Sequence, residues 1–273
     1  MFQKDEVEPL VLRQRGAPGE PGPRALLVHG LGSSDSCWDD FVAHRPPGLD
    51  LWSAGMPWRA GGPFAVPERD ETAWISEAVA RIPGGVDLLI AHSYGALLTL
   101  TLLAEAATDP ARRAALGIRG AVLVAPFYRQ HVEDFSWEEL PGSLDLLRQG
   151  AQHTIRIRSR RAPDPDLEFD MAERSCHNLG PHWVVRYLHT YQRTPFLPVD
   201  LIDLPVRVVV GACDSIASPA EGETLAARLG NASIDRIDGS GHTPMAERPE
   251  RFSRVVQQFL TTLPAGRPPA AVN

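Results

Sequence analysis

Ser93 lies at the centre of the pentapeptide AHSYG, residues 91–95, between two apolar runs. Residues 86–90 are typical of a buried strand, and residues 96–103 are typical of a helix that follows it directly. A serine at such a sharp strand-to-helix turn forms a nucleophile elbow, which lifts the hydroxyl out of the fold and exposes it to a substrate. Ala91 occupies the place of the first glycine in the common GxSxG pattern. The chemistry expected of Ser93 is nucleophilic attack on a carbonyl carbon.

Two later loops supply what a nucleophilic serine needs, a base that takes its proton and a third group that orients the base. Asp214 follows the strand-like run at residues 206–210, and His242 follows the run at residues 233–237. Both come after the carboxyl end of an expected strand, which is where parallel sheets carry their chemistry. The sequence therefore predicts a catalytic triad of Ser93, Asp214 and His242.

The chain order serine, aspartate, histidine, with each residue just past a strand, resembles the α/β-hydrolase family. Residues 26–32, LLVHGLG, match the family's HG loop, and the resemblance extends over residues 25–263. It implies a mostly parallel central sheet with helices on both faces, together with a helical cap. The resemblance also implies support of the HG loop by His29 and Gly30, and an oxyanion hole formed by the backbone amides of Leu31 and Tyr94.

Other interpretations of these residues need only local structure. Ser93 taken alone could be a helix N-cap, and Asp214 could be a turn residue that caps the segment from Pro219 onward. The position of all three triad candidates just past strand ends favours the catalytic interpretation. Two further aspartates precede the strand at residues 206–210 and lie at its wrong end: Asp200 and Asp203.

His92 neighbours Ser93 but is not expected to be its base, because adjacent residues at a sharp turn point apart. We interpret it as a packing and hydrogen-bonding residue, an ordinary role for histidine. The expected cap holds five more histidines, none of them in an HxxxH or HExxH pattern: His131, His153, His177, His182 and His189. No metal site is predicted, and the expected chemistry needs no cofactor.

The order of the expected elements divides the chain into a core and an insertion. Residues 1–126 and 205–263 are predicted to form the core, residues 127–204 a helical cap and residues 264–273 a disordered tail. Alternating strands and helices in the core favour an α/β fold. The expected core strands include residues 7–13, 25–29, 49–53 and 121–125, and the expected core helices include residues 68–82 and 249–263. The expected cap helices are residues 143–149 and 171–191, separated by the Pro/Asp-rich residues 162–166.

Composition restricts the functions open to the chain. The 273 residues carry a formal net charge of −7 and are 43% hydrophobic, which suits one globular domain with an insertion. An acidic balance argues against nucleic acid as a partner. Residues 96–107, the longest apolar run, are too short to span a bilayer, and residues 1–8 lack the apolar stretch of a secretory signal. Three cysteines without CxxC spacing complete the prediction of a cytoplasmic protein without a membrane partner.

A run of arginines marks the expected cap. Residues 148–161 contain five arginines and no acidic residue. Such a run is commonly a solvated face. A more specific interpretation is a docking surface for an acyl carrier protein with its pantetheine arm, because the planar guanidinium binds phosphate and carboxylate well. The arginines are Arg148, Arg156, Arg158, Arg160 and Arg161.

Large apolar residues gather in or near the loops after the second and third expected strands. On this fold those loops border the mouth of the pocket, which predicts an apolar acyl group in the substrate. Packing in the core is the alternative, with Trp38 anchoring the helix after the HG loop. The residues are Trp38, Trp52, Met56, Trp58 and Phe64.

These observations predict a serine hydrolase, of esterase or thioesterase type, that cleaves a small-molecule acyl substrate through an acyl-enzyme on Ser93. A lyase or eliminase of the same fold could instead use His242 as a base on substrate carbon. An acyltransferase or cyclising thioesterase could exclude water from the same intermediate. A non-catalytic binding module is expected to lose one of the three triad residues, and all three are present.

Overall fold

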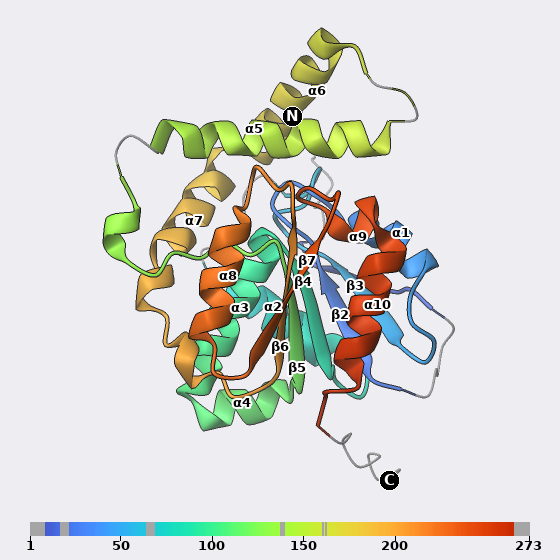
Figure 1. The fold of residues 1–273 in the computed structure, drawn as a ribbon, viewed down its shortest axis with the longest axis vertical. Helices are drawn as coiled ribbons and strands as arrows, with labels where there is room; N and C mark the ends of the chain where they lie inside the picture. The colour runs from blue at the N-terminus through green and yellow to red at the C-terminus, as the bar shows by residue number, and fades with distance from the viewer. Residues whose placement is uncertain are drawn as a thin grey trace, which may run out of the picture.

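A central sheet covered by helices on both faces, with further helices above one edge, makes up the computed structural model (Figure 1). Some sequence-based predictions fall outside the residues that it describes, among them residues 1–8, residues 265–273 of the predicted tail, and the side chains of Phe64 and Arg160. The described residues are 9–16, 22–63, 69–136, 140–159, 161 and 163–264.

Seven strands form one sheet in this part of the chain, in the order β1-β3-β2-β4-β5-β6-β7. β1 pairs antiparallel with β3, and the other pairs are parallel. Every residue of β4 and β5 is buried, and their sequences LLIAH and GAVLV are correspondingly apolar. The strands are β1 (Val11–Gln14), β2 (Arg24–Val28), β3 (Asp50–Gly55), β4 (Leu88–His92), β5 (Gly120–Val124), β6 (Val206–Gly211) and β7 (Ala232–Ile237).

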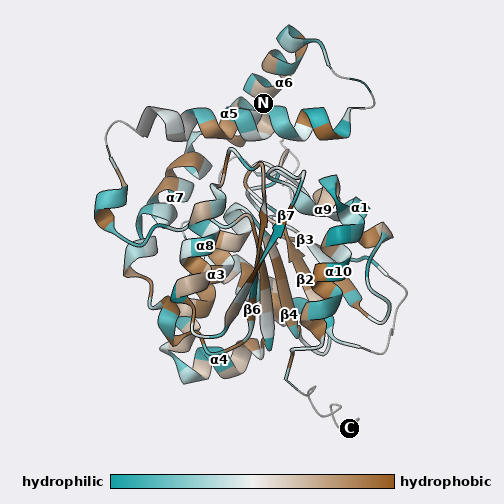
Figure 2. Cartoon of the chain, in the orientation of Figure 1, coloured by the Kyte–Doolittle hydropathy of each residue, from teal (hydrophilic) through white to brown (hydrophobic). Residues whose placement is uncertain are grey.

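Alternate residues of the strands enter two separate core clusters, one on each face of the sheet. Leu26 belongs to the cluster that includes buried side chains of α2, α3 and α8, whereas Leu27 belongs to the cluster that includes those of α1, α9 and α10. Figure 2 shows the apolar strands between helices that carry hydrophilic residues on their outer surfaces. The predicted α/β fold is thereby confirmed. The core helices are α1 (Asp39–Ala43), α2 (Thr72–Arg81), α3 (Tyr94–Ala107), α4 (Pro110–Leu116), α8 (Pro219–Arg228), α9 (Pro244–Glu247) and α10 (Pro249–Leu260), with a 3-10 turn, η1 (Asp35–Trp38).

In the described residues between β5 and β6, the chain forms three more α-helices, α5 (Leu140–Arg158), α6 (Pro165–Leu179) and α7 (Pro181–Gln192), and the 3-10 turns η2 (Val132–Asp134), η3 (Thr194–Phe196) and η4 (Val199–Leu201). α5 lies across the carboxyl edge of the sheet, α6 packs against it, and α7 contacts α3 of the core (Figure 1). The helix predicted at residues 143–149 is therefore much longer than expected, while the cap boundaries at residues 127–204 stay a prediction. Within the described ranges, no helix combines the length and apolar character of a bilayer-spanning segment.

The prediction of one helix at residues 171–191 is wrong, because α6 ends and α7 begins inside this range. Gly180 has a φ of +79°, which residues with a side chain rarely adopt, and Pro181 cannot donate the amide hydrogen bond that would continue a helix. The Pro/Asp-rich stretch before α6 is itself partly helical. Pro165 is the first residue of α6, and the carboxylate of Asp164 caps its N-terminus.

Candidate active site

Ser93 occupies the sharp turn between β4 and α3. Its φ of 56° and ψ of −121° lie where non-glycine residues are rare, and its amide donates to the Val124 carbonyl at 2.8 Å. Gly95 permits this turn, because a Cβ there would lie 2.6 Å from the His29 carbonyl oxygen. Although Ser93 is the N-cap residue of α3, its side chain makes no capping hydrogen bond. Capping therefore does not explain the serine.

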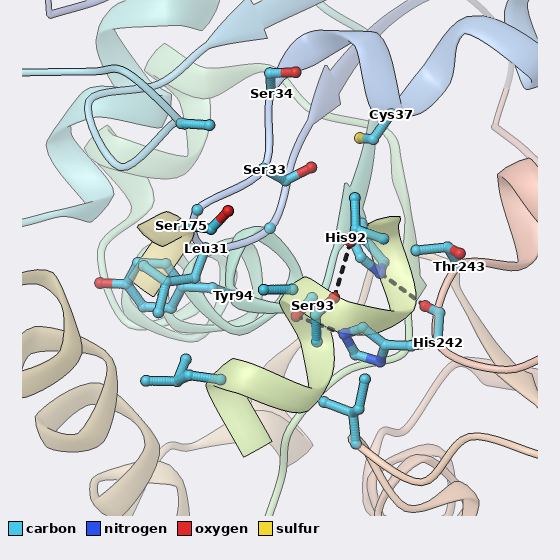
Figure 3. Close-up of a pocket in the computed structure, with 18 of the residues that line it drawn as sticks. Leu31, Ser33, Ser34, Cys37, His92, Ser93, Tyr94, Ser175, His242 and Thr243 are labelled. Atoms are coloured by element: carbon cyan, nitrogen blue, oxygen red, sulfur yellow. Dashed lines mark hydrogen bonds between the residues drawn. The ribbon is translucent and has the colours of Figure 1, made fainter. Parts of the chain in front are cut away.

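The structure brings His242 and Asp214 together with Ser93, and the imidazole faces the serine hydroxyl (Figure 3). Oγ–H of Ser93 donates to Nε2 of His242 at 3.0 Å, and Nδ1–H of His242 donates to Oδ2 of Asp214 at 2.9 Å. An ionised carboxylate only accepts hydrogen bonds, so it holds the proton on Nδ1 and leaves the Nε2 lone pair for the serine. Each of the three residues is only 7% exposed, which keeps bulk water away from this chain of hydrogen bonds.

Two backbone amides fix the carboxylate of Asp214. Its Oδ1 accepts from the amides of Ile216 at 2.8 Å and Ala217 at 3.0 Å. Burial raises the pKa of this carboxyl, but the charge of His242 and these hydrogen bonds outweigh burial and hold the pKa below its usual value. These two bonds make Asp214 a turn residue, as the alternative interpretation expected, in addition to its bond to His242. The segment from Pro219 onward is capped by Ser218 and not by Asp214.

A close contact between two glycines brings the loops of Asp214 and His242 together. A Cβ on Gly211 would lie 1.9 Å from the Gly241 carbonyl oxygen, so only glycine fits at the end of β6. The amide of Cys213 then donates to the Ser240 carbonyl at 2.8 Å. Sequence reasoning missed this contact. The available signals were Gly211, directly after the strand-like run that precedes Asp214, and Gly241, directly before His242.

Leu31 of the HG loop and Tyr94 of α3 lie close to Ser93 at the cavity (Figure 3). Tyr94 is the first residue of α3, so its amide has no carbonyl one turn back, and the Leu31 amide makes no hydrogen bond within the described part of the chain. Gly30 brings the HG loop against the serine, since a Cβ there would lie 2.9 Å from the Ser93 Cβ. Two unused donors beside a serine suit an oxyanion hole, and this role stays a prediction.

His29 and His92 are buried, neutral links between loops. In His29, Nδ1–H donates to the Gly30 carbonyl at 2.7 Å and Nε2 accepts from the Met56 amide at 3.0 Å. In His92, Nε2–H donates to the backbone carbonyl of His242 at 2.8 Å, as expected of a packing and hydrogen-bonding residue. Burial lowers the pKa of His29 to about 4 and that of His92 to about 3. Both rings are therefore uncharged at neutral pH.

Glu247 holds the loop that carries His242. Its Oε2 accepts from the Gly241 amide at 2.8 Å, and its Oε1 accepts from the amide and the hydroxyl of Thr243 at 2.9 and 3.0 Å. Nε2 of His153, on α5, lies 3.0 Å from the same Oε1. Burial raises the pKa of Glu247, but the hydrogen bonds from His153 and the two amides lower it to about 2. Sequence reasoning missed this network, and the acidic residue shortly after His242 was the available signal.

A cavity of about 250 Å³ opens beside Ser93. The core contributes Gly30, Leu31 and His242 to its floor, and α5 and α6 contribute its roof. Apolar side chains therefore face the serine from above. The apolar residues of the roof are Leu146, Leu147, Ala151, Ile155, Ile157 and Leu179.

The loops after β2 and β3 border the cavity as predicted, through residues such as Leu31 and Ala60. The large apolar residues expected to line it do not do so, and Phe64 lies outside the described residues. Trp38, Met56 and Trp58 are fully buried in the core, and none of them lines the cavity. Trp52 is partly buried and packs against the core. The Trp38 ring contacts Phe41 and Phe252 edge-on or tilted, which agrees with the alternative of an anchor for the following helix. Sequence composition could not show which way these side chains point.

The arginines of α5 do not form one uniform basic face. Arg148 and Arg156 pair with acidic side chains of α5 and α6. Arg158 lines the cavity, where Nη2 donates to Oγ of Ser36 at 2.9 Å, and among the described residues no carboxylate lies within ion-pair distance of it. Arg161 is exposed. The part of the run available to an external anion is therefore its C-terminal end.

Within the described part of the chain, no group of three or more histidine, cysteine or carboxylate side chains is placed to hold a metal ion. His153 is committed to Glu247, and His182 accepts a hydrogen bond from Arg186 at 2.9 Å. The three cysteines are free thiols. Cys37 is buried, Cys176 is half-buried and Cys213 is exposed.

A comparison with protein families agrees with this geometry. The profile described as "Alpha/beta hydrolase family" matches residues 25–255. The chain belongs to the α/β-hydrolase family. The predicted fold and family are thereby confirmed, and this α/β-hydrolase is an enzyme of the serine-hydrolase type, as the sequence predicted.

Curated relatives of this α/β-hydrolase are named as esterases. A protein of Neisseria meningitidis serogroup A called pimeloyl-[acyl-carrier protein] methyl ester esterase is 26% identical over 259 residues, covering 89% of this chain and 80% of the relative. A protein of the same name from Aromatoleum aromaticum is 24% identical over 253 residues, covering 87% and 98%. The likeness covers at least 80% of each chain.

Solved structures share the fold of this α/β-hydrolase. A thermophilic esterase from Thermogutta terrifontis superimposes with a TM-score of 0.65 at 17% identity, covering 93% of both chains. A carboxylesterase from Bacillus subtilis gives a TM-score of 0.63 at 16% identity, covering 93% of this chain and 88% of the other. At these identities the likeness is one of fold.

Proposed function

We propose that this α/β-hydrolase hydrolyses an ester or thioester of an acyl group through an acyl-enzyme on Ser93. The observation that carries the proposal is the chain of two hydrogen bonds from Ser93 Oγ to His242, 3.0 Å, and from His242 to Asp214, 2.9 Å. A serine hydroxyl beside an imidazole that a carboxylate orients is suited to nucleophilic attack on a carbonyl. The strained turn aims the hydroxyl at the cavity.

In the acylation step, Ser93 Oγ bonds to the carbonyl carbon as its proton moves to Nε2 of His242. The carbonyl electron pair moves to oxygen, where the amides of Leu31 and Tyr94 donate to the oxyanion. Each such donor contributes about 3 to 4 kcal/mol to transition-state stabilisation. Asp214, kept ionised by its lowered pKa, stabilises the imidazolium. The tetrahedral intermediate then expels the alcohol or thiol, which leaves with the proton from His242.

Water completes the cycle in the deacylation step. His242 takes a proton from a water molecule, whose oxygen bonds to the acyl carbon. The second tetrahedral intermediate breaks at the Ser93 ester oxygen, which regains its proton from His242. One water is consumed, a carboxylic acid is released, and no cofactor takes part.

The substrate half of the proposal is an apolar acyl chain whose ester is carried on an acyl carrier protein. Two features support it, the apolar roof over Ser93 and the cations at the end of α5, where Arg158 lines the cavity and Arg161 is exposed. The curated relatives named above are called esterases of a pimeloyl-[acyl-carrier protein] methyl ester. Guanidinium groups suit the phosphate of a pantetheine arm and the acidic surface of a carrier.

The acylation step is tested by intact-mass analysis after rapid mixing with slow acyl esters and thioesters. We expect an acyl adduct on Ser93, labelling of the same residue by a fluorophosphonate, and loss of both in Ser93→Ala. Turnover that persists in Ser93→Ala, with no adduct in the parent, would contradict the proposal and indicate base chemistry by His242.

The carrier is tested with Arg161→Glu, at an exposed position that does not line the cavity. We expect KM for a carrier-bound ester to rise about threefold, with a weaker salt dependence than in the parent, while turnover of a small aryl ester stays within about twofold. Arg254→Glu, an exposed site on α10, is the matched control for net charge. Equal responses of the two substrates would show that the end of α5 is only a solvated face.

A further inference from the structure

α5 is attached to the core at two polar points. Among its described side chains, Arg158 bonds to Ser36 and His153 bonds to Glu247 and Thr243. Its other side-chain bonds to charged groups stay within α5 or reach α6, as in the pair of Arg156 with Glu168. The roof of the cavity therefore meets the catalytic floor mainly through these two attachments.

The His153 attachment lies directly on the backbone of the loop that carries His242. Nε2 of His153 is 3.0 Å from Oε1 of Glu247 and 3.2 Å from Oγ1 of Thr243. A Cβ on Gly241 would lie 3.0 Å from Cε1 of the His153 ring, so the ring covers this glycine closely. The residues on both sides of His242 are thus in contact with a side chain from the roof.

Glu247 transmits this contact to His242. Its carboxylate accepts hydrogen bonds from the amides of Gly241 and Thr243, the two neighbours of His242 in the chain. One oxygen, Oε1, is shared between Thr243 and His153. A carboxylate that loses one donor is free to rotate about its side-chain bonds, and rotation here would shift the loop. Misplacement of a reacting group by about 1 Å costs up to about a hundredfold in rate.

His153 does not line the cavity, so it cannot act by touching the acyl chain. We propose that His153 is a positioning residue: by bonding to Glu247, it aligns His242 with Ser93 when α5 covers the cavity. The inference rests on the proposed role of His242 as the base. In this inference α5 has two roles: it lines the pocket, and through His153 it holds the loop that carries His242.

The test compares kcat and KM of His153→Ala and His153→Gln for 4-nitrophenyl acetate and 4-nitrophenyl octanoate. We expect His153→Ala to lower kcat about tenfold for both esters, with KM within about twofold, because the defect lies in proton transfer and not in acyl binding. The glutamine amide can still donate to Glu247, so His153→Gln is expected to stay within about threefold of the parent. A combination of His153→Ala with Glu247→Gln should lose no more than Glu247→Gln alone, since the two act in series.

His189→Ala, at an exposed position on α7, is the matched control and is expected to leave both constants unchanged. Thermal melts of every variant identify any loss of folding. Three outcomes would each overturn the inference. The first is a parent-like kcat in His153→Ala, the second is an effect confined to KM for the octanoate, and the third is an equal loss of kcat in the alanine and glutamine variants. Ser93→Ala is assayed alongside. Activity in that variant would overturn the proposed function. An inactive Ser93→Ala together with a parent-like His153→Ala would overturn only the role of His153.

Discussion

Below the cavity, Ser93, Asp214 and His242 sit on loops at the carboxyl ends of buried parallel strands. Above it, α5 lies over those loops with exposed polar faces and two polar attachments, at His153 and Arg158. The floor is fixed by close backbone packing that admits only glycine at several points. The roof is held by side chains.

This difference separates two tasks of the site. Close packing and buried hydrogen bonds give the floor one geometry, because interiors of proteins do not deform continuously. A helix held by a few polar contacts has a lower free energy of local opening than a strand in the sheet. Under the proposed function, the rigid region carries the chemistry, and the region held by fewer contacts selects the acyl chain.

The largest expected effect comes from the floor. Replacing Ser93, Asp214 or His242 with alanine should lower kcat at least about a thousandfold, and double variants should lose little more, because the three act as a unit. Leu147→Ala in the roof removes only apolar contact and should raise KM about tenfold or less. Steady-state kinetics on one aryl ester measure both. A His242→Ala variant with near-parental kcat would break the comparison.

Glycine substitutions give the next largest difference between the regions. In Gly211→Ala the new methyl group meets the Gly241 carbonyl oxygen at 1.9 Å, so the free energy of unfolding should fall by about 3 kcal/mol, with loss of activity. The control is Gly142→Ala in α5, where a Cβ has no neighbour within 4 Å. That variant should gain about 0.5 to 1 kcal/mol, since alanine favours a helix. Urea denaturation measures the free energy of unfolding of both variants. A Gly211→Ala variant as stable as the parent would contradict the close contact between the two loops.

Acid sensitivity is expected from the floor through His29 and His92, the two histidines whose pKa burial lowers. The pKa of His29 is about 4 and that of His92 about 3 in the folded protein, both below the unfolded value of 6.5. As pH falls below about 6.5 the unfolded chain binds protons that the folded chain does not, so stability is lost by up to about 1.4 kcal/mol per histidine per pH unit. Unfolding free energies at about pH 7.5 and about pH 5.5 should differ less in His92→Gln than in the parent. If the difference in unfolding free energy between the two pH values is the same in His92→Gln as in the parent, His92 does not contribute to the acid sensitivity.

The smallest effect is expected between the roof helices themselves. Arg156→Gln leaves the carboxylate of Glu168, a residue only 5% exposed, without its partner at 2.6 Å. Because Arg156 itself is mostly exposed, the loss should be about 1 kcal/mol. Hydrogen exchange should become faster in α6 and stay unchanged in α3. Arg254→Gln on α10 is the control, and faster exchange throughout the molecule would contradict a local role.

The floor could be predicted from the sequence because its signals are local. A small-residue turn after an apolar strand, and polar residues just past two others, lie within a few positions of each triad residue. The roof could not be predicted in the same way. Helical apolar spacing continues across Gly180 and Pro181, which hid the break between α6 and α7. The bond of His153 to Glu247 joins residues 94 positions apart, and no periodic pattern reports such a pairing.

The junction at Gly180 and Pro181 has a consequence for changing the acyl preference of this enzyme. Beyond it, α7 packs against the core, with Trp183 and Tyr187 buried and Arg186 bonded to Glu71. α5 and α6 precede the junction. Their sequences can therefore be varied together while the sequences of β5 and α7 are kept. Libraries restricted to these two helices would search for new acyl preferences while the inherited reaction stays intact, provided that position 153 keeps a donor for the carboxylate below it.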